Sequence, residues 1–307
     1  MASSHSPKVA VGPEPAPSWL VDAVVDGGGM LVDPSEADAV VWADVAAPEE
    51  LARVVEAATN ARWIQLPWAG VERFADLLDH DHVWTCGKGV YADPVAEIAL
   101  ALGLAGLRNI HTYAAATSWS GESGRTLLGA RVSIIGGGGI AESLIRLLQP
   151  FGCHITVVRA NVQHMEGVDD VVDAEHLADA LPGADLVVLA LALTADTEGL
   201  ISEDELSLME PHAWIVNVAR GRHIVTDDLV EALRNGTIGG AGLEVTDPEP
   251  LPGDHPLWAL ENCIITPHTG TTREMAVPLL TERVRENVHR FATGQDLLGL
   301  VDVRAGY

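Results

Sequence analysis

The stretch VSIIGGGGIAESLI, residues 132–145, joins a run of branched apolar residues to the start of a predicted helix through four consecutive glycines. Branched apolar residues of this kind favour a buried β-strand. A glycine-rich turn between a strand and a helix presents free backbone N–H groups at the helix N-terminus, where they can bind phosphate. The stretch therefore predicts a phosphate-binding strand–turn–helix unit. The alternative is a glycine-rich turn without a ligand.

The spacing of the small residues refines this prediction. Gly136, Gly138 and Ala141 follow the dinucleotide-binding pattern G-x-G-x-x-G, with alanine in the third position. The first glycine permits a tight turn, the second lets the backbone approach a pyrophosphate, and the third small residue lets the helix pack on the strand. A second predicted strand, residues 154–159, follows the helix as such a unit requires.

The residue at the end of that second strand indicates which dinucleotide binds. An acidic residue there usually holds the ribose 2′-hydroxyl of NAD, but this chain has Arg159, 23 residues after Gly136. An arginine suits the 2′-phosphate of NADP because its guanidinium makes charge-assisted hydrogen bonds. Arg159 therefore predicts NADP as the preferred cofactor, with NAD as the alternative. Without a function it would be a solvated surface arginine.

Composition limits the remaining possibilities. The chain has 307 residues, 48% hydrophobic and 20% charged, which is typical of a soluble globular protein with two domains. Its longest uncharged apolar run, residues 98–107, is too short to span a bilayer, and the N-terminal MASSHSPKVAV lacks the apolar core of a signal peptide. Three scattered cysteines suggest neither disulfides nor a metal site. We expect a cytoplasmic protein without a metal.

The net charge of −26, with only two lysines, argues against nucleic acid and anionic membranes as partners. An anionic ligand must then be bound by a few arginines or backbone amides, against an unfavourable overall field.

Short β-branched runs alternate with helical patterns along the chain, which predicts an α/β fold with parallel sheets covered by helices. The predicted strands are residues 9–12, 38–43, 62–67, 83–86, 131–136, 154–159, 184–191, 213–219 and 262–267, and the predicted helices include 49–58, 143–151 and 226–236. A long helix from Asp93 to about Ala116 is expected to connect two α/β lobes.

Other dinucleotide or phosphate enzymes fit less well. The chain lacks the Tyr-x-x-x-Lys of short-chain dehydrogenases and the Gly-Lys-Ser/Thr of a P-loop. A methyltransferase usually has an acid where Arg159 stands.

Several later motifs occur in a distinctive order. They are NVARG with Arg220, AGLEVTDPEP with Glu249 and ITPHTG with His268, together with LPWAGVE, DPVAE, LLGARVSIIGGGGI, LTADTEGLI, RNGTIGGAGLEV, PEPLPGDHPLW and VDVRAGY. In this order they resemble the D-isomer-specific 2-hydroxyacid dehydrogenase family from about Trp63 to the C-terminus. Taken singly, Arg220 would be a surface cation, Glu249 a loop acid, and His268 one of twelve histidines without a functional role.

The resemblance implies catalytic roles. His268 is the expected general acid and base, Glu249 orients its imidazole, and Arg220 binds the substrate carboxylate and polarises the carbonyl. The backbone amides of Ala69 and Gly70 are similar to the family's second carboxylate anchor. Trp68 beside them could cap a small pocket or belong to the core.

The resemblance also implies a set of cofactor contacts. Expected at the pyrophosphate, adenosine and nicotinamide parts are Gly136, Gly138, Gly139, Ile140, Ala141, Arg159, Leu191, Thr197, Val218, Ala219, Arg220, Glu244, His268 and Gly270. Two positions depart from the family. Glu244 replaces the usual aspartate at the nicotinamide carboxamide, and Ala190-Leu191-Ala192 replaces a frequent His-x-Pro.

The implied architecture has two Rossmann-like domains with doubly wound parallel sheets. A discontinuous substrate domain, residues 1–92 and 282–307, would receive an inserted dinucleotide-binding domain, residues 93–281. The substrate would lie in the cleft between them, and the family generally forms homodimers.

The expected activity is reduction of a small 2-keto acid, such as glyoxylate or hydroxypyruvate, to the D-2-hydroxy acid. Two alternatives stay open: a dinucleotide-sensing, corepressor-like binding protein, and the same chemistry on a larger or phosphorylated 2-keto acid.

Overall fold

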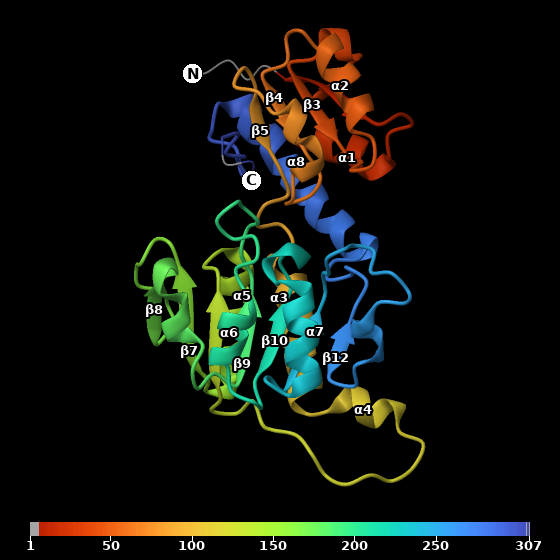
Figure 1. Ribbon diagram of the computed structural model, residues 1–307. Coiled ribbons are helices and arrows are strands. Elements are labelled where there is room, and N and C mark those ends of the chain that lie inside the picture. Colours follow the sequence, from red (N-terminus) through yellow and green to blue (C-terminus); the bar gives the residue numbers. More distant parts are fainter. Residues whose placement is uncertain (1–5, 305, 307) are drawn as a thin grey trace. The chain divides into compact units, whose positions relative to one another are not determined.

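The computed structural model describes residues 6–304 and 306. Residues 1–5 of MASSHSPKVAV and residues 305 and 307 of VDVRAGY lie outside the described residues. The chain forms two compact units: a first unit of Met1–Tyr91 with Thr272–Tyr307, and a second unit of Ala92–Thr271. Each unit has its own sheet and its own hydrophobic core (Figure 1).

The second unit is built on a seven-stranded sheet whose strand pairs are all parallel. Its strands, in spatial order, are β12 (Cys263–Ile265), β11 (Gly240–Leu243), β10 (Trp214–Asn217), β9 (Leu186–Leu189), β6 (Arg131–Ile135), β7 (His154–Arg159) and β8 (Asp170–Asp173). The chain runs outward from β6 in one direction through β7 and β8, and then returns to β9 beside β6. Ligands of open parallel sheets bind at such a reversal of strand order.

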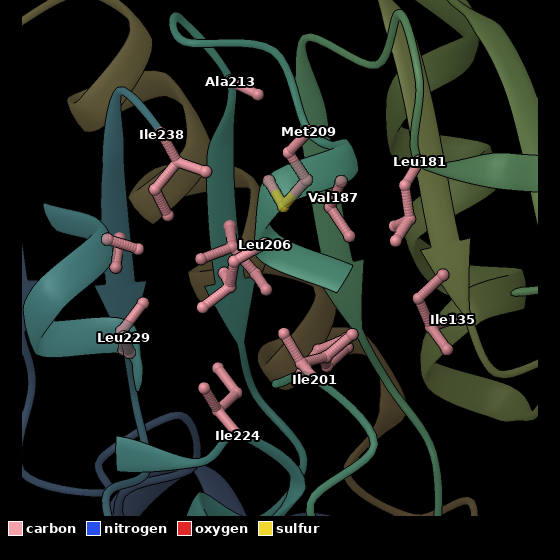
Figure 2. Close-up of a cluster of buried hydrophobic side chains, with 14 of the residues drawn as sticks. Ile135, Leu181, Val187, Ile201, Leu206, Met209, Ala213, Ile224, Leu229 and Ile238 are labelled. Atoms are coloured by element: carbon pink, nitrogen blue, oxygen red, sulfur yellow. The ribbon is translucent and has the colours of Figure 1, made fainter. Parts of the chain in front are cut away.

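Helices cover both faces of this sheet, which confirms the predicted α/β class. On one face lie α3 (Ala92–Leu107) and α5 (Gly139–Leu148); on the other lie α6 (Glu203–Leu208), α7 (Thr226–Asn235) and the 3-10 helix η4 (Ala174–Ala180). Successive strand residues enter opposite cores: Ile134 packs with the first set of helices and Ile135 with the second. Figure 2 shows the second of these cores.

The first unit has a five-stranded parallel sheet. Its strands, in spatial order, are β2 (Met30–Leu31), β1 (Lys8–Gly12), β3 (Ala39–Trp42), β4 (Trp63–Gln65) and β5 (Val83–Thr85). Side chains of α1 (Ser18–Asp26) and α8 (Arg273–Thr293) pack on one face. Those of α2 (Pro48–Ala57) and the 3-10 helix η2 (Glu72–Leu77) pack on the other.

The remaining short elements of the two units are η1 (Pro34–Glu36) in the first and α4 (Ile110–Ala115), η3 (Gln149–Phe151), η5 (Gly221–His223) and η6 (Pro256–Ala259) in the second.

The return of the chain to the first unit comes earlier than expected, at residue 272 rather than 282. The reason is that α8 is one continuous helix whose apolar side packs on α1. Buried Asn287 of α8 also donates to Gln65 Oε1 of β4 (2.8 Å) and to the carbonyl of Leu298 (2.9 Å).

The expected long helix from Asp93 to Ala116 is two helices, α3 and α4. Asn109 separates them because its φ of 55° is left-handed and cannot continue an α-helix. Strands β2, β8 and β11 were not among the predicted strands. None of the helices in the described part of the chain is long and apolar enough to cross a membrane.

Candidate active site

The sequence-predicted residues of the second unit gather at one edge of its sheet. Because all its strands are parallel, the loops that follow them emerge at the same edge. Four of these loops carry the candidates: Gly136 follows β6, Arg220 follows β10, Glu244 follows β11 and His268 follows β12.

Gly136 closes the turn after β6 tightly. Its φ is 116°, and a Cβ placed there would lie 2.2 Å from the carbonyl oxygen of Ala190. Its N–H donates to the carbonyl of Val158 at 2.8 Å. The loops after β6 and β9 therefore meet, backbone to backbone, where the strand order reverses. Only glycine permits both this φ and this contact.

The N-terminus of α5 is open to a ligand. Gly138 is its N-cap residue, with no side-chain cap, and a Cβ there would meet no atom within 4 Å. Ala141 is fully buried in the core shared with α3. The first N–H groups of a helix have no intrahelical acceptor, so Gly139, Ile140 and Ala141 start a helix suited to a pyrophosphate.

Arg159, the last residue of β7, extends over this turn. A Cβ on Gly137 would lie 2.9 Å from both Cδ and Nε of Arg159. Asp173 of β8 is the partner of Arg159 in the strand register. Its carboxylate accepts a hydrogen bond from the N–H of Glu175 (2.9 Å). The Arg159 side chain therefore stands beside the glycine turn.

His268 and Glu249 form a pair. Nδ1 of His268 lies 2.7 Å from Oε1 of Glu249, and both side chains are about half exposed, at 50% and 44%. With Nδ1–H donating to the carboxylate, Nε2 is the ring nitrogen that faces away from Glu249. His268 has a φ of 52°, an uncommon conformation in which histidine, asparagine and aspartate are enriched. Its N–H donates to the carbonyl of Glu244 (3.0 Å), which holds the loop in place.

Glu244 lies inside the loop that carries the histidine. The residue is 2% exposed, and its two carboxylate oxygens accept separate hydrogen bonds from the hydroxyl of Thr266 and the N–H of Gly270. The carboxylate of Glu244 thus bridges Thr266 and Gly270, the residues that flank Pro267–Thr269. Thr266 was not singled out in the sequence, although it lies in the motif ITPHTG.

Asn217 is a second residue that the sequence analysis missed. It is buried, donates from Nδ2 to the carbonyl of Arg220 (2.9 Å), and accepts from the N–H of Ala219 (3.0 Å). It thereby shapes the turn from which the Arg220 side chain extends. Arg220 also donates from Nη1 to the carbonyl of Ala219 (2.8 Å). The only sequence signal for Asn217 was its place at the start of NVARG.

Gly221 brings this turn against the segment that carries Glu249. A Cβ on Gly221 would lie 2.0 Å from the carbonyl carbon of Thr246. A larger residue would therefore separate the arginine turn from the segment that leads to Glu249.

His223 connects the same turn to the loop after β9. The ring is fully buried, with Nδ1 2.8 Å from the carbonyl of Thr197 and Nε2 3.3 Å from that of Leu191. Burial lowers the pKa of His223 below its ordinary value, so the ring is neutral near pH 7 and its N–H is assigned to the shorter contact. The N–H of His223 thus holds Thr197 to the turn after β10, and the carbonyl of Leu191 lies beside the other ring nitrogen. Nearby, Val218 is buried, and its N–H donates to the carbonyl of Leu189 (3.2 Å).

The first unit contains the predicted second anchor. Ala69 is exposed and Gly70 partly exposed, in the loop that follows β4. The ring of Trp68 packs on that of Tyr91, with their centroids 5.0 Å apart. Within the described ranges, the N–H groups of Trp68, Ala69 and Gly70 donate to no protein acceptor.

These observations establish a class of protein. The second unit has a doubly wound parallel sheet, a glycine turn that fits a pyrophosphate, and a histidine–carboxylate pair at the same edge. They are the features of an oxidoreductase that uses a nicotinamide dinucleotide.

The comparison with protein families identifies this oxidoreductase. The family model "D-isomer specific 2-hydroxyacid dehydrogenase, NAD binding domain" matches residues 74–270. The chain belongs to the D-isomer-specific 2-hydroxyacid dehydrogenase family, whose members are NAD(P)-dependent enzymes.

Relatives of known sequence extend this match. An uncharacterized protein in the proB 3′ region of Corynebacterium melassecola is 38% identical over 298 residues, 93% of this chain and 95% of that protein. The glyoxylate reductase/hydroxypyruvate reductase of Homo sapiens is 34% identical over 221 residues, 69% of this chain and 65% of that enzyme.

Solved structures share the whole fold. A D-isomer specific 2-hydroxyacid dehydrogenase from Xanthobacter autotrophicus Py2, in complex with NADPH and MES, has a TM-score of 0.85 at 26% identity, covering 99% of this chain and 100% of that one. An NADPH-dependent glyoxylate/hydroxypyruvate reductase from Sinorhizobium meliloti, in complex with NADP and sulfate, has a TM-score of 0.81 at 25% identity, with the same coverage.

Proposed function

We propose that this protein reduces a small 2-keto acid of the glyoxylate or hydroxypyruvate type to the D-2-hydroxy acid with NADPH. The observation that carries the proposal is the His268–Glu249 pair, 2.7 Å apart at the sheet edge where the glycine turn also lies. The glyoxylate/hydroxypyruvate reductases among the relatives support the substrate class.

The proposed chemistry assigns one task to each residue. The bound nicotinamide supplies the hydride that C2 of the keto acid accepts. His268 donates the proton that the developing alkoxide needs, and Glu249 stabilises the imidazolium before that transfer. Arg220 binds the substrate carboxylate and polarises the carbonyl, together with the backbone amides of Ala69 and Gly70. In the oxidation direction each step runs in reverse.

The cofactor contacts are proposed on the same basis. The pyrophosphate is assigned to the turn of Gly136 and Gly138 and to the helix start at Gly139, Ile140 and Ala141. We assign Leu191 and Thr197 to the adenosine part and Arg159 to the 2′-phosphate. The nicotinamide part is assigned to Val218, Ala219, Arg220, Glu244, His268 and Gly270. In this proposal Glu244 acts by shaping the loop of His268 and Gly270.

We expect Arg159→Ala to weaken NADPH binding by about 10- to 100-fold, because charge-assisted hydrogen bonds contribute about 1.5–3 kcal/mol each. NADH binding is expected to stay within about twofold, since NADH has no 2′-phosphate for the guanidinium to contact. Fluorescence titration with both cofactors measures the two constants. Arg131→Ala is the matched control. It removes the same charge from the first residue of β6, at the end of that strand away from the glycine turn. Equal loss of both cofactors in Arg159→Ala would contradict the NADP assignment.

The substrate is tested by following oxidation of NADPH and NADH with glyoxylate, hydroxypyruvate, pyruvate, phenylpyruvate and 2-ketoisovalerate. Saturable turnover of one of the two small acids supports the proposal. Turnover of the larger acids alone would show the same chemistry on a larger 2-keto acid and contradict the proposed substrate class. Cofactor binding without turnover of any of the five favours the dinucleotide-sensing alternative.

We also propose that the protein is a homodimer and that its second unit forms the interface. Large apolar side chains stand exposed around α4 and the loop after it, which extends away from the sheet (Figure 1): Ile110 is 54%, Trp119 102% and Leu128 66% exposed. Analytical ultracentrifugation is expected to give twice the chain mass, and Trp119→Ser to shift the equilibrium toward monomer. A monomeric wild type at micromolar concentration would contradict the proposal.

A further inference from the structure

The loop Pro67–Gly70, here called the anchor loop, is held from behind by the segment Cys86–Tyr91. Three successive carbonyls of the loop accept hydrogen bonds from this one segment. The carbonyl of Pro67 accepts from the hydroxyl of Tyr91 (2.8 Å), that of Trp68 from the N–H of Gly87 (2.9 Å), and that of Ala69 from the thiol of Cys86 (3.6 Å).

These bonds determine where the N–H groups of the anchor loop point. In a planar trans peptide the C=O of one residue and the N–H of the next point in opposite directions. In an extended strand successive carbonyls alternate in direction, but here three successive carbonyls face the same segment. The N–H groups of Trp68, Ala69 and Gly70 therefore all point away from it. Such a run of N–H groups binds anions.

The segment behind the loop is itself rigid. A Cβ on Gly87 would lie 2.6 Å from the carbonyl oxygen of Pro67, so the two backbones are in direct contact. Arg283 of α8 donates from Nη1 to the carbonyls of Cys86 (3.2 Å) and Lys88 (3.0 Å). The direction of the three N–H groups is thus set by contacts that run through the first unit to α8.

We infer that Tyr91 is a positioning residue for the substrate carboxylate, and that Trp68 contributes a third N–H donor beside Ala69 and Gly70. The ring of Tyr91 packs on Trp68 and is 6% exposed, so its hydroxyl has one fixed direction. That hydroxyl holds the Pro67–Trp68 peptide, the first of the three. The inference rests on the proposed function for the identity of the anion, a 2-keto carboxylate.

Tyr91→Phe removes the hydroxyl and keeps the ring on Trp68. We expect the KM for the keto acid to rise about 3- to 10-fold, the range that one net hydrogen bond contributes. The kcat and the KM for NADPH should stay within about twofold, because Tyr91 acts in this inference only through the anchor loop, by its bond to Pro67 and its packing on Trp68. The ratio of kcat/KM for the keto acid to kcat/KM for its primary amide should fall by the same factor as the KM for the keto acid rises. Thr281→Val, which removes a hydroxyl that donates to the carbonyl of Val277 within α8 of the first unit, is the control and should change none of these values.

A measurement independent of turnover separates this inference from the proposed function. Amide-resolved NMR of the full chain with NADP and oxamate should shift the amides of Trp68, Ala69 and Gly70, and Tyr91→Phe should require more oxamate for the same shift. If those amides respond but no keto acid is turned over, the proposed function fails and the anion site stands. Turnover without any response of these amides overturns the inference. So does an unchanged KM in a folded Tyr91→Phe protein.

Discussion

Replacing His268 with asparagine is expected to lower kcat for keto-acid reduction by about 10²- to 10⁴-fold, the usual contribution of a positioned general acid. Asparagine cannot deliver a proton to the developing alkoxide. It does tolerate the left-handed conformation, so the φ of 52° at this position can be kept. Both the fold and the dissociation constant for NADPH should therefore change little. Steady-state kinetics and cofactor titration on the same preparation measure the two effects.

His212→Asn is the matched control for this experiment. His212 also pairs with a carboxylate in the second unit, with Nε2 2.9 Å from Oδ1 of Asp185. It was not predicted as a site residue, so its loss should leave kcat within about twofold. Glu249→Gln should fall between the two, because the imidazole keeps a hydrogen-bond partner and loses the charge that stabilises its protonated form. If His268→Asn retains more than a tenth of the activity, His268 is not the general acid.

Replacing Gly136 with alanine is expected to cost both stability and cofactor. A residue with a Cβ is strained at a φ of 116°, and that Cβ would lie 2.2 Å from the carbonyl oxygen of Ala190. Backbone strain and overpacking each contribute about 1–3 kcal/mol, so we expect the free energy of unfolding to fall by about 2–6 kcal/mol. To separate the new Cβ from the Ala190 carbonyl, the turn that leads to α5 has to move. NADPH binding should therefore weaken by at least tenfold.

Gly152→Ala distinguishes this local contact from the general cost of a positive φ. Gly152 has a φ of 62°, and a Cβ there would meet no atom within 4 Å. Its loss of stability should be about 1–2 kcal/mol, with no change in cofactor affinity. Denaturant unfolding and fluorescence titration measure both variants. Equal effects of the two substitutions on NADPH would show that Gly136 has no special part in the turn.

The sequence by itself determined the features that depend on neighbours along the chain. Runs of β-branched residues located strands such as β6, β7 and β10, because a buried parallel strand needs apolar residues on both faces. The spacing of Gly136, Gly138 and Ala141 indicated the dinucleotide turn, because each position has a local steric reason. Ordered motifs then indicated the family. Strand β11 was missed because its sequence, GAGL, contains two glycines, and glycine weakens a strand.

Only the tertiary structure decided which groups support these residues. The bonds of Glu244 to Thr266 and Gly270, and the contact of Gly221 with Thr246, join residues more than twenty positions apart. The backing of the anchor loop by Tyr91 and the chain's return at residue 272 are of the same kind. No local pattern encodes such contacts, because a hydrogen bond or a backbone clearance depends on where the packed sheet and helices bring two distant segments together.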